Sequence, residues 1–221
     1  MSKFKVAYID ELGEDIREFQ RFADDTFDIV PITPVKELDE LVSTILDEHV
    51  DAIVVDFNLI EFDKTNTINY QGSDVVDRIS EKLEDFPIFI LTSYDEDAID
   101  NNEDARIVFE KKIMYASKEQ PEIYEAGIKF KKLINKQIEK YQLRIQEAET
   151  KLLVLIEESK TRPLNAFEEQ ELIKLDGEIE RAFDKESQIP DRVREILEED
   201  KLSKLLNKVD ELAKKLNKDN D

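Results

Sequence analysis

Three acidic residues follow short apolar runs, at positions where carboxylates can hold a cation. Asp10 and Glu11 come directly after residues 4–9, and Asp56 ends the run formed by residues 53–55. A short, β-branched apolar run is typical of a strand buried on both faces. Open α/β sheets place their ligands at the carboxyl ends of such strands. An Asp at this position also often caps the next turn, so the run alone leaves both interpretations open.

These three carboxylates predict a metal site if the fold brings them together. Adjacent carboxylates raise each other's pKa unless a cation compensates their charge. Mg²⁺ suits such a site, because it binds one or two carboxylates together with water and substrate oxygens. Thr92 follows another apolar run, and Lys111 or Lys112 follows the next one. A hydroxyl and an ammonium beside a metal-bound carboxylate form a site for a phosphoryl group.

The elements that must position these residues alternate between strands and helices. Strands are expected at 4–9, 28–33, within 50–59, at 87–91 and at 105–109. Helices are expected at 14–25, 35–49 and 73–83, with a weak, acid-rich one at 96–104. This alternation predicts an α/β fold with a doubly wound parallel sheet in the order 2-1-3-4-5, flavodoxin/CheY-like. In that order the first and third strands are neighbours, so their terminal acids converge.

Residues 4 to about 115 resemble the receiver domain of bacterial two-component response regulators. The resemblance rests on the acid pair Asp10/Glu11, the strand-end Asp56, GSDVVDRI from Gly72, LTSYD containing Thr92, and a lysine in FEKK. It implies that Asp56 accepts a phosphoryl group from a phosphohistidine on a histidine kinase or phosphotransfer protein.

The resemblance also implies a cofactor and a set of binding residues. Mg²⁺ is expected on Asp10, Glu11, Asp56 and the backbone carbonyl of Asn58. Thr92 and the lysine are expected to bind the phosphoryl oxygens.

The chain departs from the receiver pattern at two places. Gly72 lies 16 positions after Asp56, a longer loop than is usual, and no Pro follows Asp56 closely. Residues 57–71 are either a lid or partner contact, or a tolerated surface insertion. Lys111 as the site lysine would put Val108 at the usual position of the switch aromatic, whereas Lys112 would put Phe109 there. The spacing slightly favours Lys111.

The second half of the chain reads as a helical interaction domain, residues 117–221, after a receiver-like domain at 1–116. A capping box at Ser117 and Gln120 predicts a helix over about 118–160, with further helices near 166–186, capped by Asn165 and Glu168, and near 190–217. Apolar residues in the long helix alternate steps of four and three. This seam comprises Ile134, Ile138, Tyr141, Ile145, Ala148, Leu152 and Leu155. Such spacing fits either a coiled-coil homodimer or an intramolecular bundle.

Composition excludes several classes of function. The 221 residues carry a formal net charge of −22, which disfavours direct binding to nucleic acid or to anionic membranes. There is no Cys and a single His49, so zinc sites and His-based triads are not expected. Without a signal peptide or a long apolar run, a soluble cytoplasmic protein is expected.

The leading hypothesis is a response-regulator-like phosphoacceptor that switches a helical arm for dimerisation or partner binding. Its chemistry would be at most self-phosphorylation and slow hydrolysis of the aspartyl phosphate. The alternative is a receiver-shaped protein that is never phosphorylated and acts as an adaptor or scaffold. The sequence names neither the kinase nor the output partner.

Overall fold

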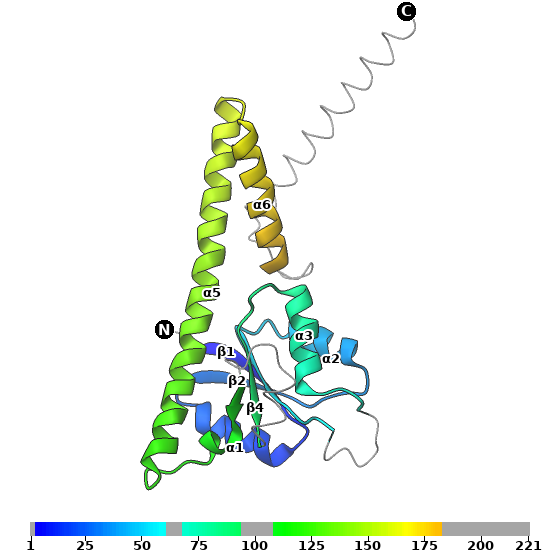
Figure 1. Ribbon diagram of the computed structural model, residues 1–221, viewed down its shortest axis with the longest axis vertical. Helices are drawn as coiled ribbons and strands as arrows, with labels where there is room; N and C mark the ends of the chain where they lie inside the picture. Colours follow the sequence, from blue (N-terminus) through cyan, green and yellow to red (C-terminus); the bar gives the residue numbers. More distant parts are fainter. Residues whose placement is uncertain (1–2, 61–67, 94–107, 183–221) are drawn as a thin grey trace, which may run out of the picture. The chain divides into compact units, whose positions relative to one another are not determined.

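The computed structural model describes residues 3–60, 68–93 and 108–182, and these form an α/β part followed by helices (Figure 1). The strands are β1 (Phe4–Ile9), β2 (Phe27–Ile32), β3 (Ala52–Asp56), β4 (Ile88–Thr92) and β5 (Val108–Glu110). The helices are α1 (Gly13–Ala23), α2 (Leu38–Asp47), α3 (Gly72–Lys82), the 3₁₀ helix η2 (Lys111–Met114), α5 (Pro121–Thr161) and α6 (Ala166–Ala182).

The strands form one parallel sheet in the order β2-β1-β3-β4-β5. Ile9 of β1 lies opposite Val55 of β3, so these two neighbouring strands end side by side. This order, with helices between the strands, confirms the predicted doubly wound, flavodoxin/CheY-like fold with a helical extension. It brings the carboxyl ends of β1 and β3 to the same edge of the sheet.

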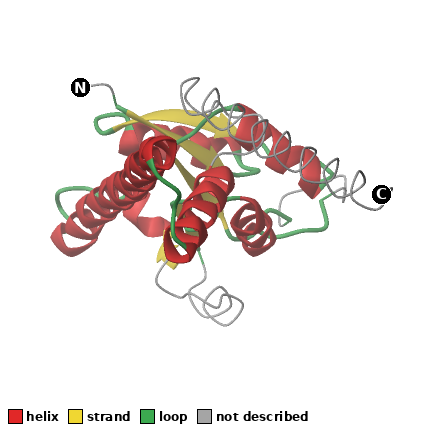
Figure 2. Cartoon of the chain, turned by 90° about the horizontal axis from the view of Figure 1, so that it is seen from above, coloured by secondary structure: helices red, strands yellow, loops and turns green. Residues whose placement is uncertain are grey.

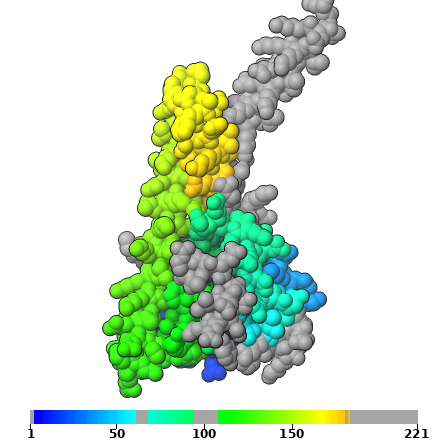
Figure 3. Space-filling view, viewed as in Figure 1, coloured from blue at the N-terminus to red at the C-terminus, as the bar shows by residue number. Residues whose placement is uncertain are grey.

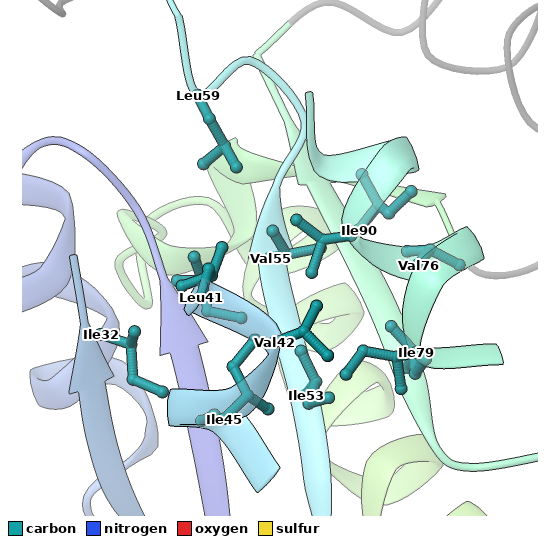
Figure 4. Packing of buried hydrophobic residues seen from close by; sticks show 14 of the residues in the cluster. Ile32, Leu41, Val42, Ile45, Ile53, Val55, Leu59, Val76, Ile79 and Ile90 are labelled. Atoms are coloured by element: carbon teal, nitrogen blue, oxygen red, sulfur yellow. The ribbon is translucent and has the colours of Figure 1, made fainter. Parts of the chain in front are cut away.

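The sheet is covered by helices on both faces (Figure 2). Side chains alternate along each strand, so Ile53 and Val55 face one layer while Ala52 and Val54 face the other. The first layer buries apolar residues of α2 and α3, which point at β3 in Figure 4. The second layer buries residues of α1 together with Phe130, Ile134 and Ile138 of α5. The central strands β3 and β4 are therefore apolar up to their terminal Asp56 and Thr92, because both of their faces are buried.

Most of the helices and strands predicted from the sequence are present, but their first and last residues differ from the predicted ones. The helix expected at 35–49 is α2, Leu38–Asp47, and the strand expected at 105–109 is described as β5, Val108–Glu110. The weak helix expected at 96–104 and the helix near 190–217 lie outside the described residues.

The long helix begins later than its predicted cap. The Gln120 N–H donates to the Ser117 carbonyl at 2.9 Å, and the Ser117 hydroxyl accepts from the Glu119 N–H at 3.3 Å. These bonds form a turn, so the predicted capping box at Ser117 and Gln120 was wrong. The helix starts at Pro121 because proline suits the first helical position, where its missing N–H costs nothing.

The predicted seam of α5 is buried against different neighbours along its length. Ile134 and Ile138 belong to the second layer, between the sheet and the helices α1 and α5. Ala148 and Leu152 pack in a separate core with α6. Between them, Tyr141 meets Phe86 edge to face at 5.4 Å. Ile145 is buried, and Leu155 packs against the core shared with α6. The seam is therefore covered within the chain.

Contacts divide the chain into two compact units, residues 1–147 and 148–221, and α5 contributes to both. This division lies later than the boundary predicted at 116/117, because the first half of α5 covers the sheet. In the second unit, α6 lies against the last turns of α5 (Figure 3). Its cap is confirmed: the Glu168 N–H donates to Asn165 Oδ1 at 3.0 Å, and the Asn165 N–H donates to Glu168 Oε2 at 2.9 Å.

The burial of α5 gives a first test. Ile138→Ala is expected to destabilise the protein by about 3 kcal/mol, because it opens a cavity in the core beneath the sheet. Leu143→Ala, five residues further along and 54% exposed, is expected to change stability by less than about 0.5 kcal/mol. Urea unfolding followed by circular dichroism measures both. Equal losses for the two variants would show that this part of α5 does not belong to the core.

Candidate functional site

The carboxyl ends of β1, β3 and β5 bring two acids and one lysine together. Asp10 follows β1, Asp56 ends β3, and Lys111 follows β5, and all three side chains are buried. The Lys111 ammonium lies 2.9 Å from Asp10 Oδ2 and 2.9 Å from Asp56 Oδ1. The structure thus places these three predicted site residues in direct contact.

Only one of the two candidate lysines reaches these acids. Lys112 is exposed and pairs with Glu110. Phe109, the other residue considered for a switch, packs against Phe130 of α5 with ring centroids 4.7 Å apart. The geometry therefore gives the site lysine as Lys111 and puts Phe109 in the aromatic contact between β5 and α5.

The structure also shows how the Asp56 carboxylate is held. Its Oδ2 accepts the Asn58 N–H at 3.2 Å, while Oδ1 contacts Lys111. Thr92 is buried at the end of the adjacent strand β4, in register with Glu110 of β5. Thr92 therefore ends the strand that neighbours β3, and the Asn58 amide belongs to the residues that directly follow Asp56.

Asp10 has contacts on both of its oxygens. Its Oδ1 accepts the Leu12 N–H at 2.8 Å, and its Oδ2 accepts the Tyr8 hydroxyl at 2.7 Å as well as Lys111. Tyr8 was missed by sequence reasoning. It lies in β1, two residues before Asp10, and this spacing along extended backbone puts both side chains on one face.

A third carboxylate on the lysine was also missed. The Lys111 ammonium lies 2.6 Å from Asp15 Oδ2, in the first turn of α1, and the Tyr115 hydroxyl donates to Asp15 Oδ1. Asp15 is an acid in the first turn of α1, where acids are common. The sequence carried no signal that it would contact the lysine.

The acids at these strand ends fit a hard divalent cation. Asp10, Glu11 and Asp56 each offer an oxygen within 4.8 Å of the others. Glu11 Oε2 is buried without a hydrogen-bond partner among the described residues. Among the described residues, the site with Asp15 contains four carboxylates and one ammonium, that of Lys111. Oxygen ligands and an excess of negative charge suit Mg²⁺.

Burial changes the ionisation of the site. It raises the pKa of Asp56 to about 6, although the neighbouring Lys111 charge lowers it. Burial also raises the pKa of Glu11 to about 7, against the effect of a backbone hydrogen bond. For Lys111, burial alone would lower the pKa, but the charges of Asp56 and Asp10 outweigh it and raise the pKa above its ordinary value. The ammonium therefore remains charged, while the two carboxyls ionise late.

The raised pKa of Glu11 predicts a pH dependence of stability. Between pH 4.5, its ordinary pKa, and about 7, the folded protein binds more protons at Glu11 than the unfolded chain does. The free energy of unfolding therefore falls as the pH rises through this window. In Glu11→Gln this fall is expected to be smaller, so the variant gains stability over wild type at pH 7.5.

The measurement is the urea midpoint between pH 4.5 and 8, without divalent cations. Glu14→Gln, which removes an exposed carboxyl three residues away, is the matched control and is expected to follow the wild-type curve. Parallel curves for wild type and Glu11→Gln would contradict the effect assigned to Glu11.

The long β3–α3 loop is anchored at both ends. Leu59 and Tyr70 are buried in the core, and the Tyr70 hydroxyl donates to the Val35 carbonyl. The Gly72 N–H donates to the Phe57 carbonyl at 2.8 Å. Residues 61–67, which belong to the predicted lid or insertion, lie outside the described residues.

Gly72 permits a close approach of α3 to the site. A Cβ at Gly72 would lie 2.2 Å from the Asp56 carbonyl oxygen, so Gly72→Ala must displace the backbone of Asp56. We expect a destabilisation of about 2 kcal/mol or more, together with weaker Mg²⁺ binding. At Gly13, where the nearest atom to a Cβ is 3.7 Å away, Gly13→Ala is expected to be neutral or stabilising by about 0.5 kcal/mol. Urea unfolding and calorimetric Mg²⁺ titration measure both, and unchanged values in Gly72→Ala would contradict the contact.

Comparison with known proteins adds little to this geometry. No protein-family model and no curated protein matches the chain. Its structure is similar to the response regulator RcsB of Salmonella typhimurium, with 13% identity and a TM-score of 0.41, covering 82% of this chain and 91% of that one. It is also similar to a fusion protein carrying a yeast Spc42 trimeric coiled coil, with 15% identity and a TM-score of 0.41, covering 70% and 97%.

The fold is therefore assigned from the sheet itself. The five-stranded parallel order fits a receiver fold. In the described part of the chain, no helix is both long and apolar enough to cross a membrane.

Proposed function

We propose that this protein is a phosphoryl acceptor of the receiver type, with Asp56 as the acceptor and a protein phosphohistidine as the donor. The supporting observation is the buried Asp56 carboxylate, held 2.9 Å from Lys111 and grouped with the carboxylates of Asp10 and Glu11. Asp10, Glu11, Asp56 and the Asn58 carbonyl would hold Mg²⁺. When bound, Mg²⁺ supplies positive charge that neutralises the phosphoryl oxygens.

The residues of the chain account for the rest of the transfer. The ionised Asp56 carboxylate attacks phosphorus, the bond from phosphorus to the donor imidazole breaks, and an aspartyl phosphate forms. The Asn58 N–H orients the attacking carboxylate through Oδ2. Lys111 and the Thr92 hydroxyl bind the transferred oxygens. Such transfer depends mainly on positioning and charge, so no general base is required.

The output is expected to pass through the helical part to a protein partner. Lys111 begins η2, and α5 follows and contributes to both compact units. A change in the contacts of Lys111 therefore acts on η2, which leads into α5. With a net charge of −22, a protein partner is favoured over nucleic acid. A homodimer through the α5 seam would first have to expose Ile134, Ile138 and Leu152.

The test is intact-protein mass spectrometry after incubation with acetyl phosphate and Mg²⁺. We expect one added phosphoryl group on the wild-type chain, and none when EDTA removes the metal. A phosphoryl group that forms equally well in EDTA, or no group at all with Mg²⁺, would contradict the proposal.

One observation favours the second function, an adaptor that is never phosphorylated. The Lys111 ammonium already contacts three carboxylates, so the described site balances part of its charge without a phosphoryl group. Beryllofluoride distinguishes the two functions, because it mimics a phosphoryl group on a receiver acid. Binding with Mg²⁺ supports the acceptor, and no binding with a fully folded protein supports the adaptor.

A further inference from the structure

Lys111 uses all of its hydrogen-bonding capacity in the site. An ammonium has three N–H donors and no acceptor. Its three carboxylate contacts are Asp10 at 2.9 Å, Asp56 at 2.9 Å and Asp15 at 2.6 Å. Asp10 and Asp56 come from strand ends, whereas Asp15 comes from the first turn of α1. The shortest contact of the lysine is thus made by the acid that the predicted site did not contain.

Asp15 is itself fixed by a second hydrogen bond. Its Oδ2 contacts Lys111, and its Oδ1 accepts the Tyr115 hydroxyl. Lys111 is the first residue of η2, and Tyr115 directly follows that helix. Asp15 therefore contacts the residues at both ends of η2.

We propose that Asp15, oriented by Tyr115, is a positioning residue that holds the Lys111 ammonium toward Asp56. The inference rests on the proposed function and adds a residue to its site. When Asp56 becomes an aspartyl phosphate, a phosphoryl oxygen takes the place of its carboxylate on the lysine. Asp10 and Asp15 keep the other two donors, so the ammonium stays aligned. Without Asp15, the Lys111 ammonium loses its shortest contact, and its flexible four-carbon stem is held less firmly.

Three substitutions separate positioning from a simple effect of charge. Asp15→Ala removes both the acceptor and the charge, whereas Asp15→Asn removes the charge and keeps an acceptor oxygen. Tyr115→Phe keeps the charge and removes the hydrogen bond that orients it. If Asp15 acts by positioning, Asp15→Ala forms the aspartyl phosphate slowly and Asp15→Asn recovers part of the rate. Tyr115→Phe is also expected to form it more slowly than wild type. A charge effect predicts equal rates for the two Asp15 variants and a wild-type rate for Tyr115→Phe.

The experiment measures initial rates of aspartyl phosphate formation in the full chain, over a range of acetyl phosphate concentrations with Mg²⁺. Asp15→Ala is expected to lower kcat on the order of tenfold with little change in KM, because a small misplacement of a binding group slows group transfer. Glu14→Ala removes the same charge from the exposed neighbouring position and is expected to match wild type. A wild-type kcat in Asp15→Ala, or the pattern expected of charge, overturns the inference while leaving the acceptor function intact.

A second measurement reports on Lys111 without phosphorylation. In ¹⁵N NMR spectra the Lys111 ammonium is expected to give a signal protected from solvent exchange in wild type, and to lose it in Asp15→Ala and Tyr115→Phe. If the wild-type chain takes up no phosphoryl group, the proposed function fails and these spectra still decide the inference. A protected signal that persists in both variants overturns it.

Discussion

Asp56→Asn is expected to abolish phosphorylation while leaving the fold intact. An amide is not a nucleophile toward phosphorus, so no aspartyl phosphate can form at this position. The amide oxygen can still accept from Lys111 or from the Asn58 N–H, both of which contact the Asp56 carboxylate. Because the substitution removes one of four crowded acids, stability at pH 7.5 is expected to stay equal or to rise.

Intact mass after acetyl phosphate treatment, together with urea unfolding, tests both halves of this expectation. Asp28→Asn makes the same chemical change at an exposed position on β2 and is expected to be phosphorylated like wild type. Phosphoryl uptake by Asp56→Asn at the wild-type level would show that another residue is the acceptor.

Lys111→Met is expected to damage both stability and phosphorylation. It leaves the buried Asp10 and Asp56 and the partly buried Asp15 without their shared cation. Removing one partner of a buried ion pair typically costs about 3–5 kcal/mol, and we expect a loss in this range in the absence of metal. Because a divalent cation can replace part of the missing charge, Mg²⁺ is expected to restore some stability. Phosphorylation is expected to stay low, since the oxygen contact of the ammonium is gone.

Lys112→Met is the matched control. This exposed neighbour pairs with Glu110, and surface pairs contribute about 0–1 kcal/mol. Urea unfolding with and without Mg²⁺, and phosphorylation by acetyl phosphate, compare the two variants. If Lys112→Met loses more stability and activity than Lys111→Met, the assignment of the site lysine is wrong.

The fold and the centre of the site could be predicted because they depend on local patterns. Alternating strand and helix periods determine a parallel sheet, and right-handed connections leave few strand orders. Acids directly after the first and third strands then meet at one edge, as Asp10 and Asp56 do. The choice between the two lysines needed the geometry, because strand ends predicted from sequence shift by a residue or more. The strand before the lysines ends at Glu110, and Lys111 is the lysine that contacts Asp10 and Asp56.

Other features depend on tertiary contacts that no local pattern carries. Asp15 looks like an ordinary acid in the first turn of a helix, where acids are common because of the helix dipole. Only the placement of α1 beside η2 shows that it binds Lys111. The heptad-like steps of α5 are the same throughout, yet Ile138 packs beneath the sheet and Leu152 packs on α6. Spacing shows that a helix face is covered, but it does not identify what covers it.

The most direct test of the central claim is to locate the phosphoryl group on the chain. Borohydride reduces an aspartyl phosphate to homoserine, which marks the acceptor permanently. Trypsin then releases residues 37–64 as one peptide, since no Lys or Arg lies between Lys36 and Lys64. Fragmentation of this peptide after treatment with acetyl phosphate and Mg²⁺ is predicted to place homoserine at Asp56. Homoserine at Asp51 or at another acid of the chain, with Asp56 unmodified, would contradict the account.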